Sequence, residues 1–162
     1  MLRIKAKLGP SGVHGVGLFA DQFVPKGTVT WQYDPKFDIG YTEKDLAKMS
    51  SHGQRQILWY AYYDKKLKKL ILPSDDQRFI NHSFKHRNIK STPQRDIAMR
   101  DIQLGEELFC NYNEFDNTYF KRLGYTKSAL REPKKTSQKR SRVGKTSRRT
   151  IKKKTAPLMR SM

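Results

Sequence analysis

Three short stretches of the sequence combine residue types that suit ligand binding or catalysis. Residues 78–84 read RFINHSF, in which the polar run Asn81-His82-Ser83 interrupts apolar residues that enter a core. His14-Gly15-Val16-Gly17 offers a backbone that a ligand can approach closely because the two glycines carry no side chain. Residues 105–112 read GEELFCNY and end on Tyr112. Taken one at a time, these stretches predict only an Asx-type turn, a glycine turn and a core strand that ends in tyrosine.

The elements around these stretches are predicted to be mostly short strands. Apolar alternation and β-branched or aromatic residues predict strands within 2–9, 16–20, 28–33, 57–63, 67–72 and 78–80, and again on both sides of a turn at Gly105. Pro25 and Gly27 predict a further turn. The fold class is therefore mostly β, with a few short helices.

Two helices are predicted between and after these strands. Thr42 followed by Asp45 suits a helix N-cap, and Gly53 is expected to end that helix. The spacing of Phe115, Tyr119 and Leu123 predicts a second helix, which Gly124 would close.

Composition divides the chain near residue 126. The protein has 162 residues and a net charge of +19, and residues 126–162 contain 14 lysines and arginines but one acid, Glu132. Few apolar residues occur there, which predicts a disordered basic tail. Residues 1–125 are long enough for one domain with a core. A basic tail suits nucleic acid or another polyanion as a partner, and it also suits a nuclear or nucleolar targeting signal.

The composition argues against several classes of protein. The one cysteine, Cys110, permits no internal disulfide and no cysteine-based zinc cluster, so no metal site is expected. No apolar run reaches the roughly 20 residues that span a bilayer, and no secretory leader is apparent. We therefore expect an intracellular protein without a membrane partner, in the cytoplasm or nucleoid if bacterial and in the nucleus or on chromatin if eukaryotic.

In their order and spacing, the three stretches resemble the SET domain of protein lysine methyltransferases. In that family a strand of the type Arg-Phe-Ile-Asn-His-Ser precedes, by some 20 to 30 residues, a Gly-Glu-Glu-Leu strand that ends in tyrosine. The resemblance covers roughly residues 3–125 and implies small sheets with a knot-like crossing. It also implies S-adenosylmethionine as cofactor and a protein lysine as substrate, with a histone or another basic nucleic-acid-associated protein as candidates.

The resemblance assigns roles to particular residues of this chain. Tyr112 would be the catalytic residue, and His82 is expected to act structurally rather than as a general base. The residues implied in cofactor binding are Gly15, Val16, Gly17, Asn81, His82, Phe115 and Tyr119. The last two, with Phe120, would replace the zinc-bound cysteine lid of many members, although the same aromatic residues would also suit a helix anchored to the core.

The substrate channel implied by the resemblance must favour a neutral amine. A lysine has a pKa of about 10.4, so few lysines are neutral at pH 7, and a dry aromatic channel beside a sulfonium favours the neutral form. Tyr60, Tyr62 and Tyr63 are candidates for its wall, with core packing as the alternative for each. Cys110 lies two residues before Tyr112, where many members carry Phe or Tyr, which predicts a roomier channel that accepts di- or trimethylation.

Two functions remain open at this point. The first is a SET-domain lysine methyltransferase. The second is a catalytically idle SET-like module that binds a polyanion through residues 126–162. The paired presence of Asn81 and Tyr112 favours the enzyme. One departure concerns the loop after Ser83, which has one residue more than in many members and lacks their proline. The oligomeric state is not predicted.

Overall fold

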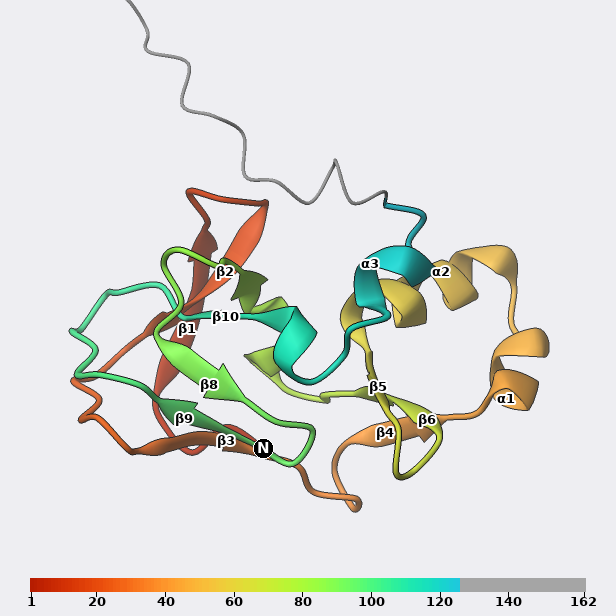
Figure 1. The fold of residues 1–162 in the computed structure, drawn as a ribbon, viewed down its shortest axis with the longest axis horizontal. Coiled ribbons are helices and arrows are strands. Elements are labelled where there is room, and N and C mark those ends of the chain that lie inside the picture. Colours follow the sequence, from red (N-terminus) through yellow and green to blue (C-terminus); the bar gives the residue numbers. More distant parts are fainter. Residues whose placement is uncertain (126–162) are drawn as a thin grey trace, which may run out of the picture. The chain divides into compact units, whose positions relative to one another are not determined.

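The structure, a computed structural model, describes residues 1–125, and the predicted tail lies outside the described residues (Figure 1). Ten short strands alternate with a few helical segments along this part of the chain. The strands are β1 (Ala6–Pro10), β2 (Val16–Ala20), β3 (Val29–Gln32), β4 (Ile39–Tyr41), β5 (Tyr62–Asp64), β6 (Lys69–Leu72), β7 (Asn81–His82), β8 (Ile89–Ser91), β9 (Arg95–Ala98) and β10 (Phe109–Cys110). The helices are α1 (Glu43–Ala47), α2 (Ser51–Tyr60) and α3 (Tyr119–Arg122), with 3-10 turns η1 (Asp76–Phe79) and η2 (Tyr112–Glu114).

The strands form four small sheets, which confirms the mostly β fold class. β1 and β2 form an antiparallel hairpin, and β3-β9-β8 and β4-β6-β5 form antiparallel sheets of three strands. β7 and β10 pair in parallel although they are far apart in the sequence. Figure 1 shows β4, β5 and β6 beside α1 and α2, apart from the sheet of β3, β8 and β9. Among the described residues, no helix is long and apolar enough to cross a membrane.

The apolar side chains of these sheets form the core that holds β7 and β10 in place. The largest cluster joins residues from β2, β8, β9 and β10 with those of the intervening turns, namely Leu18, Ala20, Val24, Ile80, Ile89, Ala98, Ile102, Leu108 and Cys110. Tyr112 and Phe115 pack against it. The strand that was predicted to end in Tyr112 therefore ends inside this core.

Several predicted strands and turns are confirmed. β2 and β3 lie within the predicted ranges. The turn at Pro25 is closed by a hydrogen bond of 3.2 Å from the Thr28 amide to the Pro25 carbonyl, with Gly27 at a φ of 84°. Gly105, at a φ of 83°, occupies the other predicted turn. Both glycines adopt a left-handed conformation that residues with a Cβ rarely take.

The prediction of a strand from residue 57 was wrong for its first half. Residues 51–60 form α2, with Ser50 as the N-cap and Ile57 buried against the core, so strand geometry begins only at Tyr62. β propensity is overridden here because the helix has a capping residue and a core-facing side chain. Gly53 does not end the first helix but lies inside α2. The Thr42 and Asp45 side chains do form the expected capping box of α1.

Two further predictions about elements were also wrong. Residues 76–79 form η1 rather than the end of a strand, because Asp75 caps the turn with a side-chain bond of 3.2 Å to the Gln77 amide. The helix expected over residues 115–123 is shorter than predicted. Only Tyr119–Arg122 form a helix, α3, and the 3-10 turn η2 precedes it.

Candidate active site

The polar run after Ile80 lies where two distant segments of the chain pass each other. Asn81 and His82 pair with Phe109 and Cys110 in the parallel β7–β10 ladder. The Ser83 amide donates to the Cys110 carbonyl at 3.0 Å, and the Tyr112 amide donates to His82 Nδ1 at 3.2 Å. The polar run is thus held in the interior by strand pairing and by hydrogen bonds with the strand that precedes Tyr112.

His82 serves this crossing as a packing residue and a hydrogen-bond acceptor. Its ring centroid lies 4.5 Å from that of Phe84, 5.1 Å from that of Phe120 and 5.2 Å from that of Tyr112. Because Nδ1 accepts the Tyr112 amide, this nitrogen is committed to positioning the chain. The arrangement supports the structural role that we expected for His82.

Asn81 ties the glycine loop to the crossing. Its Nδ2 donates to the carbonyls of His14 and Val16, both at 3.1 Å, and to Glu107 Oε1 at 3.2 Å. Three acceptors on one side fix the amide orientation, so Oδ1 faces away from them and keeps its accepting capacity.

The glycines of this loop are required by the backbone and by close packing. Gly15 has a φ of 53°, a left-handed conformation. A Cβ on Gly17 would lie 2.1 Å from Glu107 Oε1, which is far inside van der Waals contact. The loop can therefore approach β7 and the strand after Gly105 only because side chains are missing here.

Tyr112 is held by a hydrogen bond and a shell of aromatic rings. Its hydroxyl donates to the Ile80 carbonyl at 2.6 Å. Its ring stacks on Phe120 at a centroid distance of 5.9 Å and meets Tyr119 edge-on at 4.8 Å. Burial raises the pKa of Tyr112 well above its ordinary value of 10.0, with smaller contributions from Cys110 and Tyr119. The hydroxyl is therefore a neutral hydrogen-bond donor throughout the physiological range.

A single largely apolar cavity brings many of the predicted residues together. Its lining includes Tyr60, Tyr62, Cys110, Tyr112, Phe115 and Tyr119. Tyr63 does not line it; its amide instead donates to Asp116 Oδ2 at 2.8 Å. Asn81 and His82 follow Ile80, which does line the cavity, and the His14 ring reaches another lining residue, Trp59, at a centroid distance of 6.0 Å. The glycine loop, Asn81 and His82 thus lie next to the cavity without forming its wall.

Buried Asp116 anchors the C-terminal aromatic residues over this cavity. Its carboxylate pairs with Arg122 at 2.8 Å and accepts from Thr118, while the Tyr119 hydroxyl donates to the Trp59 carbonyl at 2.6 Å. These bonds join α3 to α2 and β5. Phe115 and Tyr119 therefore anchor this segment and also line the cavity, and their expected contact with a cofactor stays a prediction.

Polar residues that the sequence did not single out also line the cavity. Trp31, Gln77, Ser91 and Asp96 come from β3, η1, β8 and β9. Asp96 is 3% exposed, and burial raises the pKa of this carboxyl to about 7, although Ser91 and Gln77 act to lower it. Within RDIA, residues 95–98, the sequence does not reveal which face is buried, so only strand pairing identifies Asp96 as a cavity residue.

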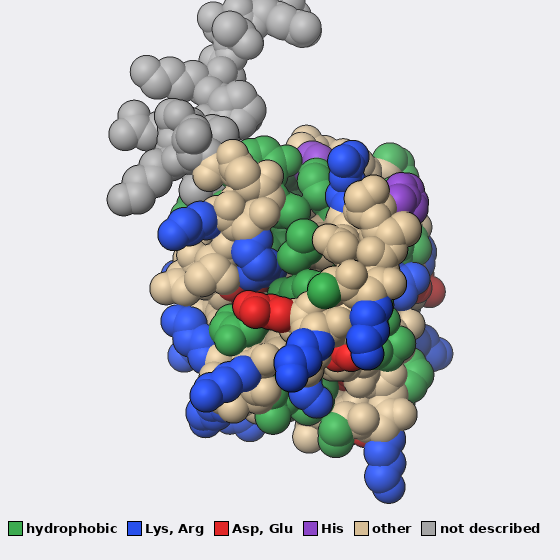
Figure 2. Space-filling view, turned by 90° about the vertical axis from the view of Figure 1, so that its right-hand side faces the viewer, with side chains coloured by type: hydrophobic (Ala, Val, Ile, Leu, Met, Phe, Trp, Pro, Cys, Tyr) green, Lys and Arg blue, Asp and Glu red, His purple; other side chains and the backbone are tan. Residues whose placement is uncertain are grey.

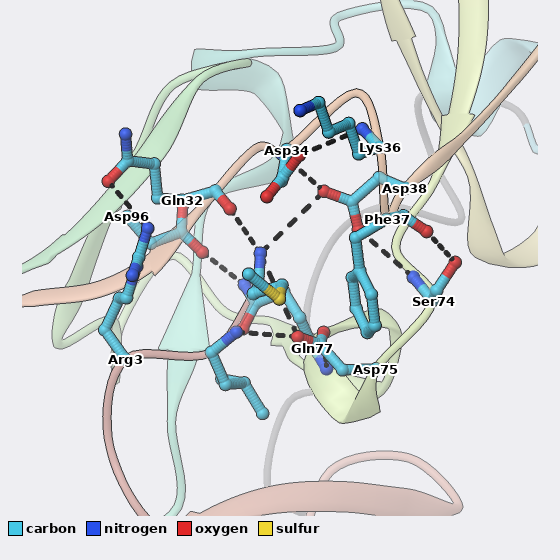
Figure 3. Close-up of polar contacts among 12 residues, drawn as sticks. Arg3, Gln32, Asp34, Lys36, Phe37, Asp38, Ser74, Asp75, Gln77 and Asp96 are labelled. Atoms are coloured by element: carbon cyan, nitrogen blue, oxygen red, sulfur yellow. Dashed lines mark hydrogen bonds and ion pairs between the residues drawn. The ribbon is translucent and has the colours of Figure 1, made fainter.

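A polar network holds η1, and with it Gln77, against the cavity (Figure 3). The Leu2 amide donates to Asp75 Oδ2 at 2.6 Å, and the carboxylate of Asp38 accepts from the amides of Asp34 and Ser74 at 2.9 and 3.2 Å. These bonds join the segment before η1 to the loop after β3, and Gln77 then reaches Asp96 with its side-chain amide.

Comparison with known proteins agrees with this geometry. The model of the SET domain matches residues 15–113, whereas no curated protein sequence matches the chain. A structure of an active polycomb repressive complex 2 in the basal state is similar at 23% identity and a TM-score of 0.51, over 67% of this chain and 15% of that one. The Chaetomium thermophilum complex in an autoinhibited conformation bound to S-adenosylmethionine is similar at 21% identity and a TM-score of 0.53, over 75% and 16%.

A shorter relative matches along nearly its whole length. A Plasmodium falciparum protein assigned to the histone methyltransferases has 18% identity and a TM-score of 0.51, over 68% of this chain and 95% of its own. The chain spans about one sixth of the polycomb chains that it matches, so these likenesses concern the fold. The family model, in contrast, covers more than half of the chain, including the glycine loop, the polar run after Ile80 and the strand that ends in Tyr112. The chain therefore belongs to the SET-domain family.

Proposed function

We propose that this protein transfers a methyl group from S-adenosylmethionine to the side-chain amine of a lysine on a protein substrate. The observation that carries the proposal is the position of the Tyr112 hydroxyl. It lies in an aromatic cavity, 2.6 Å from the Ile80 carbonyl. The next residue, Asn81, is hydrogen-bonded through its side chain to the glycine loop. Residues 1–125 would form the catalytic domain.

The residues around Asn81 fit the amino-acid end of the cofactor. The carboxamide spends its N–H groups on the loop carbonyls of His14 and Val16 and leaves Oδ1 able to accept from an ammonium group. Gly15 and Gly17 keep the loop free of side chains, so its backbone is accessible to a polar ligand. When bound, S-adenosylmethionine supplies an electrophilic methyl group on a sulfonium.

The cavity wall suits a lysine side chain whose amine is neutral when it reacts. Tyr60, Tyr62, Phe115 and Tyr119 supply apolar surface that disfavours a charged ammonium by desolvation. The Tyr112 hydroxyl oxygen and the Ile80 carbonyl oxygen lie 2.6 Å apart, and both can accept hydrogen bonds from the N–H groups of the amine, which leaves the nitrogen lone pair free and oriented. Catalysis would then arise mainly from positioning. Cys110, fully buried in the cavity, leaves room for an amine that already carries methyl groups.

A histone or another lysine-rich nuclear or nucleoid protein is the substrate class that we favour. One structural neighbour is assigned to the histone methyltransferases, and a basic protein would supply many accessible lysines. The test is to incubate the full chain with S-adenosylmethionine and either core histones or a library of lysine peptides, and to read methyl-sized mass increments. We expect increments on lysine. Bound cofactor without transfer to any of these proteins or peptides would favour a binding module instead.

Polyanion binding is the second candidate, and one described surface favours it. Six exposed lysines of α1, its C-cap and the β5–β6 hairpin form no ion pair within residues 1–125, namely Lys44, Lys48, Lys65, Lys66, Lys68 and Lys69. Figure 2 shows lysine and arginine side chains gathered on the face that carries these elements. This surface would add to the contribution of residues 126–162, and nucleic acid would then bring the enzyme close to basic substrate proteins.

A further inference from the structure

The polar residues at one end of the cavity come from three adjacent strands. In the β3-β9-β8 sheet, Asp96 lies directly opposite Trp31 on one side and Ser91 on the other. Residues directly opposite each other in antiparallel strands point to the same face of the sheet. All three line the cavity, as does Gln77, whose Nε2 donates to Asp96 Oδ2 (Figure 3). The wall of the aromatic cavity therefore contains a polar cluster in which Asp96 lies between Trp31 and Ser91.

This carboxylate is buried without a cation. Asp96 is 3% exposed, and no lysine or arginine of residues 1–125 forms an ion pair with it. The charged and titratable groups that face it are Cys110 from β10 and Tyr62 from β5, and neither carries a positive charge. An isolated buried charge is costly, so such a group is either protonated or completed by a cationic ligand.

A second buried polar group faces the same end of the cavity. Trp31 is 2% exposed, and its indole N–H has no hydrogen-bond partner among the described residues. An unpartnered donor and a carboxylate without a cation that line the same cavity indicate a site built for a polar ligand rather than a filled core. A lysine side chain that enters through the aromatic walls would bring the missing positive charge.

We infer that Asp96 is the group that receives the proton of the incoming lysine ammonium. An N–H bond of the ammonium breaks, an O–H bond forms on the Asp96 carboxylate, and the electron pair stays on nitrogen, where it can attack a methyl carbon. After product release, Asp96 returns the proton to solvent. This inference rests on the proposed function and adds a proton acceptor to the positioning role of Tyr112.

The local electrostatics suit this transfer. A carboxyl and an amine are both neutral after the proton moves, and a low-dielectric cavity favours a neutral pair over a buried ion pair. Burial raises the pKa of Asp96 to about 7, which is close to the value that serves a general base at neutral pH. Ser91 and Gln77 act in the opposite direction and keep part of the carboxyl ionised there.

The test replaces Asp96 by Asn and measures single-turnover methyl transfer from pH 6 to pH 10. In the wild-type protein the rate should rise up to about pH 7 and then level, following the ionisation of Asp96. In Asp96→Asn the rate at pH 7 should fall at least tenfold, and the rising limb should move toward the pKa of the free amine, about 10.4. Asp21→Asn, which removes a carboxylate that is 44% exposed and paired with Lys7, is the matched control and should keep the wild-type profile.

A second variant and a second readout separate the inference from a purely structural role. Ser91→Ala should move the rising limb of the pH–rate profile to higher pH, but by less than Asp96→Asn does, because it removes one of the groups that lower the Asp96 pKa. In thermal unfolding without ligands, the stability of the wild-type protein should fall between about pH 4 and pH 7, and Asp96→Asn should lack this contribution. An equal loss of rate at every pH, with an unmoved limb, would overturn the inference, as would a wild-type rate in Asp96→Asn. No transfer by the wild-type protein would instead contradict the proposed function.

Discussion

The substitution Tyr112→Phe removes one hydroxyl from the centre of the proposed site and leaves its surroundings in place. The ring keeps its stacking on Phe120 and its edge contact with Tyr119, so the variant should fold. The hydroxyl is the donor to the Ile80 carbonyl at 2.6 Å, and a buried acceptor that loses its donor costs about 1–3 kcal/mol of stability.

The catalytic effect of Tyr112→Phe should be distinguishable from this loss of stability. If the hydroxyl orients the amine, its removal should slow methyl transfer by well over tenfold, which corresponds to more than about 1.4 kcal/mol of barrier. The affinity for S-adenosylmethionine should stay close to that of the wild-type protein, since Asn81 and the glycine loop are unchanged.

The assay for this prediction is a single-turnover measurement with enzyme in excess over a lysine substrate. Tyr62→Phe is the comparison variant, because the Tyr62 hydroxyl also donates to a backbone carbonyl, that of Pro93, at 2.6 Å and lines the same cavity. We expect similar losses of stability in the two variants but a much smaller rate loss in Tyr62→Phe. Equal rate losses, or a wild-type rate in Tyr112→Phe, would refute the role of the Tyr112 hydroxyl.

Three further predictions concern the number of methyl groups in the product, the pH dependence of stability and the binding of DNA by residues 126–162. Mass spectrometry at long times should show di- or trimethyl lysine, and Cys110→Tyr should shift the product toward monomethyl; monomethyl product alone from the wild-type protein would remove this idea. Because the Asp96 pKa is raised from 3.8 to about 7, the free energy of unfolding should fall between about pH 4 and pH 7, by at most about 4 kcal/mol, and urea titrations of Asp96→Asn should lack this fall. If six charges of residues 126–162 contact phosphates, log affinity for duplex DNA should fall against log salt with a slope of roughly −5, and truncation after Tyr125 should flatten it while activity on a short peptide persists. Equal slopes would show that the tail does not bind DNA.

Local chemistry explains which parts of the fold were predictable from the sequence. The turn at Gly27 and the turn at Gly105 were predictable because a left-handed backbone requires glycine. The first half of the predicted strand from residue 57 was not, since the Ser50 cap and the burial of Ile57 outweigh the β propensity of the intervening residues.

The residues of the site that belong to a sequence motif were predictable. The residues that reach the site only through strand pairing were not. Asn81 and Tyr112 were identified by their flanking residues, and the structure places them on either side of Ile80, at one border of the cavity. Asp96 escaped notice because its burial depends on the pairing of β9 with both β3 and β8. An aspartate in a strand with alternating polarity looks solvent-facing until the register is known.

Calorimetric titration of S-adenosylmethionine into the purified full chain tests the proposed enzyme most directly. We predict one cofactor bound per chain, with clearly weaker binding in Asn81→Ala, because this change removes the two hydrogen bonds that hold the glycine loop, the bond to Glu107 and the Oδ1 acceptor. Lys7→Ala, on the exposed side of β1, is the control and should bind as the wild-type protein does. Absence of binding by the folded wild-type chain would contradict the proposed methyl transfer, and equal affinities of the wild type and Asn81→Ala would contradict the proposed cofactor site.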